Sequence, residues 1–291
     1  MSVKSIIDTL ICERAPWLSA DNRPIRCIDR ALKLALGYDK TLSLARTLSP
    51  MSGAYILKRT SADIAQDVRV EGLHNIPRSG AALIVANHPT GIADAIVLFK
   101  ALSAKRPYLY FFANRDVLRV FPQLGTHIAP VEWRKDKRSA SKSRETLEYA
   151  KAAMAEGRLG VIFPSGRLAK RHGITLVEQD WMISAVSLAK RYDVPIIPIH
   201  ISARNSILFY LLDLIHPTLR DITLFYETIN KKDFHFAVNI GAPILPSQLD
   251  ADHKIATDQM KQAVLDLNSG PFLNSHRLGL TNFAMFKHSQ S

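Results

Sequence analysis

The sequence predicts an α/β fold with a mostly parallel central sheet flanked by helices, and an N-terminal helical segment before it. From about residue 68 onward, short apolar runs alternate with longer amphipathic stretches, which is typical of βα units. The apolar runs are nearly continuous, as in strands that are buried on both faces of a parallel sheet. Earlier in the chain, apolar residues recur at helical spacing. We therefore divide the chain into an N-terminal helical segment, 1–64, and a domain, 65–291.

The N-terminal segment contains two predicted amphipathic helices, which lie on either side of Pro16 and Pro24. Both helices favour packing against a core, although a position on a bilayer surface remains an alternative. Residues 48–57 follow no clear pattern. The apolar residues that define the two helix faces are Ile6, Ile7, Leu10 and Ile11 in the first, and Ile28, Ala31, Leu32, Ala35 and Leu36 in the second.

The domain is expected to contain eight strands and a set of covering helices. The strands are predicted at 68–72 (an edge strand), 81–86, 108–113, 126–131, 159–163, 196–202, 222–226 and 235–240. The helices are predicted at 95–102, 117–121, 139–156, 178–192 and 257–267, with a loop-like tail after residue 269. The apolar run 207–215, with Asn205 as its cap, is too short to span a bilayer. It is either a buried helix or an exposed element that contacts acyl chains or a membrane.

Composition narrows the possible classes of protein. Of the 291 residues, 47% are hydrophobic, enough for a packed core. Cys12 and Cys27 fit no metal-ligand spacing and are expected to be free thiols, with a single disulfide between them as the alternative. The sequence has no secretory signal and no run of about eighteen apolar residues, so we expect a cytoplasmic protein without a transmembrane helix.

The formal net charge of +12 favours anionic partners. The basic residues form two clusters, and neither has the interleaved aromatic residues of an RNA-binding surface, so nucleic acid is not expected. An anionic membrane surface is the better candidate, and the simpler alternative is a solvated face. The clusters are Arg134, Lys135, Lys137, Arg138, Lys142 and Arg144, and then Arg167, Lys170 and Arg171.

A histidine and an aspartate flank the turn that follows the strand at 81–86. On a continuous helix His88 and Asp94 would lie about 240° apart, but Pro89 and Gly91 predict a turn that can bring Asp94 back to the imidazole. An imidazole titrates near neutrality, and a carboxylate on its far nitrogen fixes the tautomer and supports the imidazolium. The alternative is that Asp94 only caps the next helix and that His88 merely ends the strand.

Four segments together resemble the PlsC-like glycerolipid acyltransferases. Residues 87–94 are similar to block one of the haemolysin-like branch, with five residues between His and Asp. Residues 112–115, 163–168 and 194–199 resemble blocks two, three and four in the expected order, within a similar region of roughly 65–245. Block three departs from the family because Ser165 stands in place of the usual glutamate and Arg167 lies one position early.

The resemblance implies an acyltransferase domain at 65–291 that moves a fatty acyl group from acyl-CoA or acyl carrier protein to a lysolipid in membrane lipid biosynthesis. It implies that His88 is the general base and that Asp94 orients it, with backbone N–H groups of residues 90–92 as candidate oxyanion donors. No cofactor and no metal are implied. The substrate contacts that it implies are Asn87, Thr90, Gly91, Arg115, Gly166 and Arg167.

Several questions remain open at the level of the sequence. The acceptor is of the 1-acylglycerol-3-phosphate type or the lyso-aminolipid type. Arg115 could be an ordinary surface arginine, and block four could be purely structural. We expect peripheral association with the inner face of the membrane. The alternative function is a catalytically weak, peripheral lipid-binding protein of the same fold, which the altered block three would favour.

Overall fold

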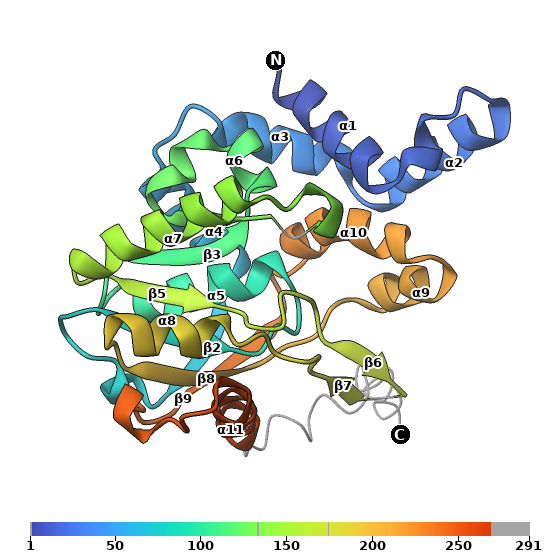
Figure 1. Ribbon diagram of the computed structural model, residues 1–291. Helices are drawn as coiled ribbons and strands as arrows, with labels where there is room; N and C mark the ends of the chain where they lie inside the picture. Colours follow the sequence, from blue (N-terminus) through green and yellow to red (C-terminus); the bar gives the residue numbers. More distant parts are fainter. Residues whose placement is uncertain (1, 133, 174, 269–291) are drawn as a thin grey trace, which may run out of the picture.

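A seven-stranded sheet forms the centre of the computed structural model, which describes residues 2–132, 134–173 and 175–268 (Figure 1). The strand order is β1-β9-β8-β2-β5-β3-β4, and every neighbouring pair is parallel except β8 and β9. The predicted fold class is therefore confirmed, with β1 at an edge as expected. The strands are β1 (Asp67–Glu71), β2 (Ala82–Ala86), β3 (Leu109–Asn114), β4 (Ile128–Val131), β5 (Leu159–Ile162), β8 (Ile196–Ser202) and β9 (His235–Ile240).

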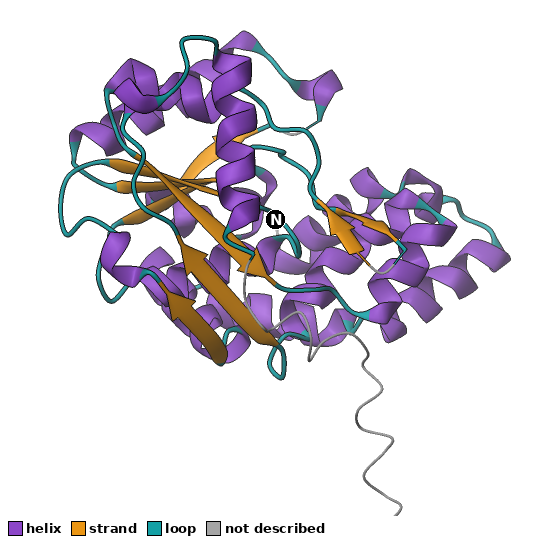
Figure 2. Cartoon of the chain, turned by 90° about the horizontal axis from the view of Figure 1, so that it is seen from below, coloured by secondary structure: helices purple, strands orange, loops and turns teal. Residues whose placement is uncertain are grey.

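Helices cover both faces of this sheet, and a small antiparallel hairpin projects from it (Figures 1 and 2). The hairpin consists of β6 (Lys170–His172) and β7 (Thr175–Val177). The helices are α1 (Val3–Arg14), α2 (Arg23–Ala35), α3 (Tyr38–Leu48), α4 (Gly53–Ile64), α5 (Ile92–Leu102), α6 (Asp116–Val120), α7 (Ala140–Ala155), α8 (Ser184–Tyr192), α9 (Ile207–Ile215), α10 (Pro217–Ile229) and α11 (His253–Asp266).

Strand β2 lies at the centre of the core and is buried along its whole length. Because successive side chains of a strand point to opposite faces, Ile84 packs with α4 and α5, whereas Leu83 and Val85 pack with α8 and α11. This burial on both faces explains the continuous apolar run in the sequence. It also makes the carboxyl end of β2 a rigid support for the residues that follow.

The N-terminal helices pack directly on the rest of the molecule. Arg14 in α1 forms an ion pair with Asp116 in α6, with 3.1 Å between the nitrogen and oxygen atoms. The indole nitrogen of Trp17 donates a hydrogen bond to Thr218 at the start of α10, at 3.1 Å. Helices α1 to α4 thus occupy residues 3–64, and the division of the chain into two domains at that point stays a prediction.

Three sequence-based predictions of secondary structure are wrong. Residues 222–226 form part of α10, not a strand, because Ile222 and Leu219 lie one helical turn apart and pack together with Ala15. This tertiary contact overrides the β propensity of the segment. The helix predicted at 178–192 begins only at Ser184, and the cap of α9 is Ser206 in place of Asn205.

The chain returns from β8 to β9 through α9 and α10, and this explains the one antiparallel pair in the sheet. Two helices in succession bring the chain back to the edge at which β8 ended, so β9 runs in the opposite direction.

None of the helices in the described ranges combines the length and the apolar character needed to cross a bilayer. Cys12 and Cys27 are exposed and free, as expected. The predicted tail after residue 269 lies outside the described residues.

Candidate active site

His88 and Asp94 meet at the carboxyl end of β2. The chain leaves β2 at Ala86, turns, and enters α5 at Ile92, which places Asp94 at the third position of the helix. The carboxylate is fully buried, and its Oδ2 lies 2.8 Å from Nδ1 of His88. The two side chains point toward each other across the turn, as the sequence predicts.

Asp94 is held by three further donors from the same turn. The backbone N–H groups of Thr90 and Gly91 each donate to Oδ2 at 2.9 Å. The hydroxyl of Thr90 donates to Oδ1. Asp94 therefore does cap the start of α5, as the simpler interpretation holds, but the same oxygen also orients the imidazole. The buried carboxylate is fixed by four contacts.

These contacts correct the prediction about the oxyanion donors. The amides of Thr90 and Gly91 already donate to Asp94, so neither N–H group is free to stabilise an oxyanion. The amide of Ile92 differs, because it occupies the first position of α5, where an N–H group has no acceptor within the helix. Thr90 and Gly91 hold Asp94 in this structure, and a substrate contact of either residue stays a prediction.

Gly91 has a backbone conformation that requires glycine. Its φ is +97° and its ψ is −126°, a region that residues with a side chain rarely adopt. An added Cβ would also lie 3.2 Å from a methyl group of Leu224 and 3.3 Å from one of Leu168. The sharp turn between His88 and Asp94 thus depends on this residue.

The imidazole of His88 is clamped on one face and open at one edge. Its ring stacks on Phe163, with 4.2 Å between the ring centroids and 19° between the planes. The side chain is 19% exposed. Because a carboxylate can only accept, the Nδ1 contact assigns the ring proton to Nδ1 and leaves the lone pair of Nε2 as a base. Within the described residues, Nε2 has no hydrogen-bond partner.

A buried glutamate holds the backbone of His88. The Oε2 atom of Glu178 accepts from the amide of His88 at 3.2 Å, and its Oε1 accepts from the indole nitrogen of Trp181 at 3.1 Å. The carbonyl of His88 accepts from the amide of Ala169 at 2.9 Å. Sequence reasoning missed Glu178 and assigned it to a helix, because nothing in the local pattern separates it from the exposed Asp180 nearby.

Asn87 connects two strands through both polar atoms of its side chain. Its side-chain Nδ2 donates to the carbonyl of Ile201 at 3.0 Å, and its Oδ1 accepts from the amide of Ile201 at 2.7 Å. The side chain thus extends the β2–β8 pairing by one residue beyond Ala86. Asn87 therefore has a structural role, and its substrate contact stays a prediction.

The residues of block three form a tight turn beside Phe163. The hydroxyl of Ser165 donates to the carbonyl of Arg167 at 2.7 Å, and the amide of Gly166 donates to the carbonyl of Phe163 at 2.9 Å. Gly166 has a φ of +57°, which favours glycine at this position. Ser165 thus closes the turn with its hydroxyl, and the Arg167 side chain is exposed. Substrate contacts of Gly166 and Arg167 stay predictions.

Arg115 lies at the same edge of the sheet but is engaged elsewhere. It follows β3, which is separated from β2 by β5 in the sheet order. Its Nη2 lies 2.5 Å from Oε2 of Glu145 in α7, whereas its buried Nε has no acceptor in the described part of the chain. A contact between Arg115 and a substrate stays a prediction.

A buried ion pair anchors the loop that faces the turn between His88 and Asp94. Lys231 and Glu227 lie 2.7 Å apart, both almost fully buried, and Lys231 also donates to the carbonyl of Arg204 at 2.9 Å. Burial lowers the pKa of Lys231, and the neighbouring Glu227 opposes this effect. Asn205, in the anchored loop, donates from Nδ2 to the carbonyl of Thr90 at 3.4 Å. Sequence reasoning missed this support because its members come together only in the folded chain.

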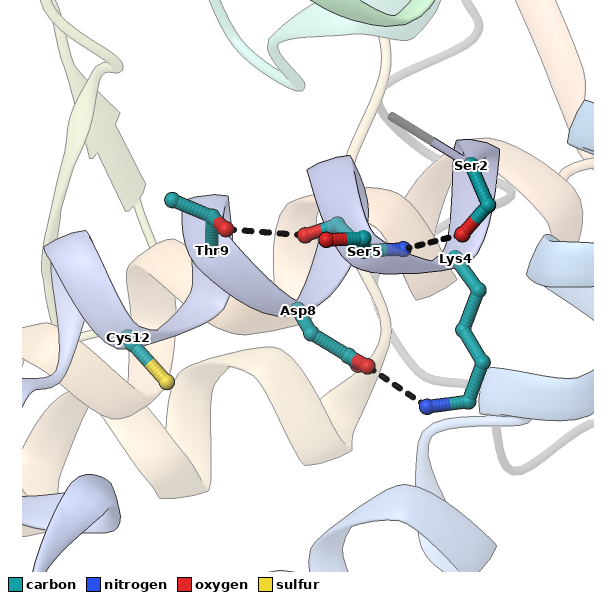
Figure 3. Close-up of a pocket in the computed structure, with 6 residues that line it drawn as sticks. All are labelled: Ser2, Lys4, Ser5, Asp8, Thr9 and Cys12. Atoms are coloured by element: carbon teal, nitrogen blue, oxygen red, sulfur yellow. Dashed lines mark hydrogen bonds and ion pairs between the residues drawn. The ribbon is translucent and has the colours of Figure 1, made fainter.

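A hollow beside α1 has no catalytic character. Figure 3 shows its lining side chains, which lie on α1 and at its cap, Ser2. Lys4 pairs with Asp8 at 2.7 Å, and the hydroxyl of Thr9 donates to the carbonyl of Ser5 at 2.8 Å, so these groups satisfy one another. The contacts of His88 involve none of them.

Comparisons with known proteins relate this chain to acyltransferases. Residues 67–202 match the family model described as Acyltransferase. Lyso-glycine lipid O-acyltransferases from Phocaeicola vulgatus and Bacteroides thetaiotaomicron are 26% and 22% identical to this chain, each over 61% of it. The alignments span 64% and 65% of these relatives, so the chain covers just under two thirds of their length.

A solved structure is also similar. The crystal structure of the 1-acyl-sn-glycerophosphate acyltransferase PlsC from Thermotoga maritima aligns with 84% of this chain and 98% of its own, at 16% identity and a TM-score of 0.49. The matched range 67–202 contains all four blocks that the sequence analysis singled out. These blocks follow one another in order along one mostly parallel sheet, so residues 67–202 are similar to the Acyltransferase family in sequence.

Proposed function

We propose that this protein is an O-acyltransferase that moves a fatty acyl group from an acyl thioester to the hydroxyl group of a lysolipid. The observation that carries the proposal is the 2.8 Å contact between Nδ1 of His88 and the buried Asp94, with the opposite edge of the ring open. This arrangement suits general base catalysis on a hydroxyl group. The match of residues 67–202 to the Acyltransferase family model supports the same reaction class.

In the proposed reaction, Nε2 of His88 takes the proton of the acceptor hydroxyl as its oxygen attacks the thioester carbonyl. Asp94 stabilises the imidazolium that forms. When the tetrahedral intermediate collapses, the carbon–sulfur bond breaks and His88 returns the proton to the departing thiolate. The products are an ester and a free thiol, and the step uses no cofactor. General base catalysis of this kind is worth about 10²- to 10⁴-fold in rate.

The start of α5 supports the negative charge that develops on the thioester oxygen. Thr90 and Gly91 donate their amides to Asp94, so the amide of Ile92 is the donor we propose from this turn. It belongs to the N-terminus of an eleven-residue helix, where the aligned peptide dipoles favour an anion.

For the acceptor, we favour a lyso-aminolipid over 1-acylglycerol-3-phosphate. The two relatives that cover 61% of the chain are both named for a lyso-glycine lipid. Ser165 favours the same acceptor. It replaces the glutamate usual in block three, and its hydroxyl bonds within the turn, so block three departs from the pattern expected for a glycerol phosphate acceptor. The donor is acyl-CoA or acyl carrier protein, and the protein acts in membrane lipid biosynthesis at an anionic membrane surface.

Purified protein should release free thiol from acyl-CoA or acyl carrier protein only when an acceptor is present. We expect faster release with a lyso-glycine lipid than with 1-acylglycerol-3-phosphate. His88→Ala should lower the rate by at least about 100-fold. His74→Ala, which changes an exposed histidine in a surface turn, is the matched control and should act like the wild type.

Full turnover by a folded His88→Ala variant would overturn the proposal. Lipid binding without transfer from either donor would instead support the alternative of a catalytically weak lipid-binding protein.

A further inference from the structure

Helix α9 exposes a continuous apolar face to solvent. Ile207, Leu211, Leu214 and Ile215 are 76%, 53%, 69% and 71% exposed. At about 100° per residue, these four side chains fall within an arc of about 100° on one side of the helix. We refer to these four residues as the α9 face.

The fold does not need the α9 face for its own stability. The opposite side of the helix provides the packing, since Phe209 is buried and Leu208 and Leu212 contact the cluster that joins α10 to the N-terminal helices. Large apolar side chains gathered on one exposed helix side usually mark a surface of interaction. Sequence analysis left two alternatives for this run, and in the structure it is neither fully buried nor fully exposed.

Basic side chains border the α9 face. The hairpin β6–β7 lies beside α9 in both views (Figures 1 and 2), and all three residues of β6 are exposed: Lys170, Arg171 and His172. The guanidinium of Arg171 lies 5.5 Å from the ring centroid of Tyr210 in α9, which connects the hairpin to the helix. We call these three residues the basic hairpin.

The charges on α9 and in the other basic cluster are largely paired. Asp213, the one acidic residue of α9, lies 3.4 Å from Arg220. In the cluster between residues 134 and 144, Arg134 lies 2.8 Å from Glu13 and Lys142 lies 2.9 Å from Glu132. The basic hairpin is therefore the better site for an anionic surface, and it adjoins the α9 face.

Both elements connect directly to the catalytic turn. The hairpin begins one residue after Ala169, whose amide donates to the carbonyl of His88 at 2.9 Å. Helix α9 begins two residues after Asn205, whose side chain donates to the carbonyl of Thr90 at 3.4 Å. A surface that seats both elements would therefore lie close to His88.

We infer that the α9 face and the basic hairpin together dock on an anionic lipid bilayer. Apolar side chains enter the acyl-chain boundary while lysine and arginine contact the head groups, as in amphipathic helices that lie in a membrane interface. The purpose of this docking is to let a lysolipid pass from the bilayer to His88, and in this respect the inference rests on the proposed function. The docking itself is measured independently of any acyl transfer.

The test is sedimentation of the protein with vesicles of phosphatidylcholine, with and without phosphatidylglycerol. We expect binding that requires phosphatidylglycerol and weakens with salt. The double variant Leu211→Gln/Leu214→Gln should weaken binding by at least about 50-fold, from the apolar burial that two leucines lose. Lys170→Gln/Arg171→Gln should weaken binding about tenfold or more and reduce its salt dependence.

The matched control is Leu147→Gln/Ile255→Gln, which removes two exposed apolar side chains from α7 and α11. It should bind vesicles like the wild type. Equal binding by the control and by Leu211→Gln/Leu214→Gln would overturn the inference. The inference would also be overturned if the wild type does not bind vesicles but forms a concentration-dependent dimer that Leu211→Gln/Leu214→Gln abolishes. A second copy of the chain would then cover the α9 face.

Thiol release separates this inference from the proposed function. If the wild type binds vesicles through the α9 face but transfers no acyl group, only the proposed function fails. If it acylates a dispersed short-chain lysolipid but never sediments with vesicles, only the docking inference fails. His88→Ala should sediment like the wild type.

Discussion

Replacing Asp94 with asparagine tests whether the carboxylate contributes charge or only geometry. The amide oxygen of asparagine can take the place of Oδ2 and accept from His88, Thr90 and Gly91. Its amide nitrogen then faces the hydroxyl of Thr90, which can accept in place of donating. The arrangement is preserved, and the negative charge beside the imidazole is lost.

The expected loss of activity follows from the distance between the two charges. Nδ1 of His88 and Oδ2 of Asp94 lie 2.8 Å apart, which places the centres of the charged groups about 4 Å apart. At an effective dielectric constant of about 20, the attraction is about 4 kcal/mol. Since about 1.4 kcal/mol corresponds to a tenfold change in rate, kcat should fall about 10³-fold.

The stability of the Asp94→Asn variant should change by less than about 2 kcal/mol. Neutral hydrogen bonds are weaker than those to a carboxylate, but the variant also removes the cost of burying a charge. Thiol release under single turnover measures the chemical step, and urea unfolding measures the stability. Asp63→Asn, which removes an exposed charge paired with Arg59, is the control and should keep the wild-type kcat.

A folded Asp94→Asn variant whose kcat lies within about fivefold of the wild type would refute the electrostatic argument. Asp94 would then act only as the cap of α5 and the holder of the turn. A large loss of stability together with the loss of activity would show that the asparagine does not keep the arrangement, and Thr90→Val would then test the support of Asp94 alone.

Three further predictions concern the framework around the site. Burial lowers the pKa of His200 from 6.5 to about 4. As the pH falls, the unfolded chain therefore binds a proton before the folded chain does. About 3 kcal/mol of the stability present above pH 6.5 should be lost by about pH 4. Urea unfolding across this pH range should show the loss in the wild type and not in His200→Gln. An equal dependence of the free energy of unfolding on pH in both proteins would contradict this prediction. Glu178→Ala leaves the indole of Trp181 and a backbone amide without an acceptor, so thermal unfolding should show a loss of about 2–4 kcal/mol, and an unchanged midpoint would exclude this role. Gly91→Ala should lower both stability and kcat because Gly91 has a φ of +97° and close neighbours. The control Gly80→Ala, at a φ of +80° with open space around it, should lower stability alone. Equal effects of the two variants on kcat would contradict the role of the turn.

The sequence by itself was sufficient for the fold class and for the central pair of the site. Continuous apolar strands alternating with helices specify a mostly parallel sheet, because only burial on both faces explains them. The contact between His88 and Asp94 was predictable because the residues are six apart and the turn between them is local. Proline and glycine restrict such a turn strongly enough to be recognised from the sequence.

Only the tertiary structure decided what surrounds that pair. Glu178 lies ninety positions from His88, and Asn205 lies 115 from Thr90, so no local pattern joins them. The segment 222–226 resembles a strand until its contacts with the N-terminal helices make it part of α10. Likewise, the apolar residues of 207–215 are alike in sequence, and which of them face solvent depends on where α10 packs. Local chemistry determines turns and periodicity, whereas long-range packing determines which side chains are buried, paired or exposed.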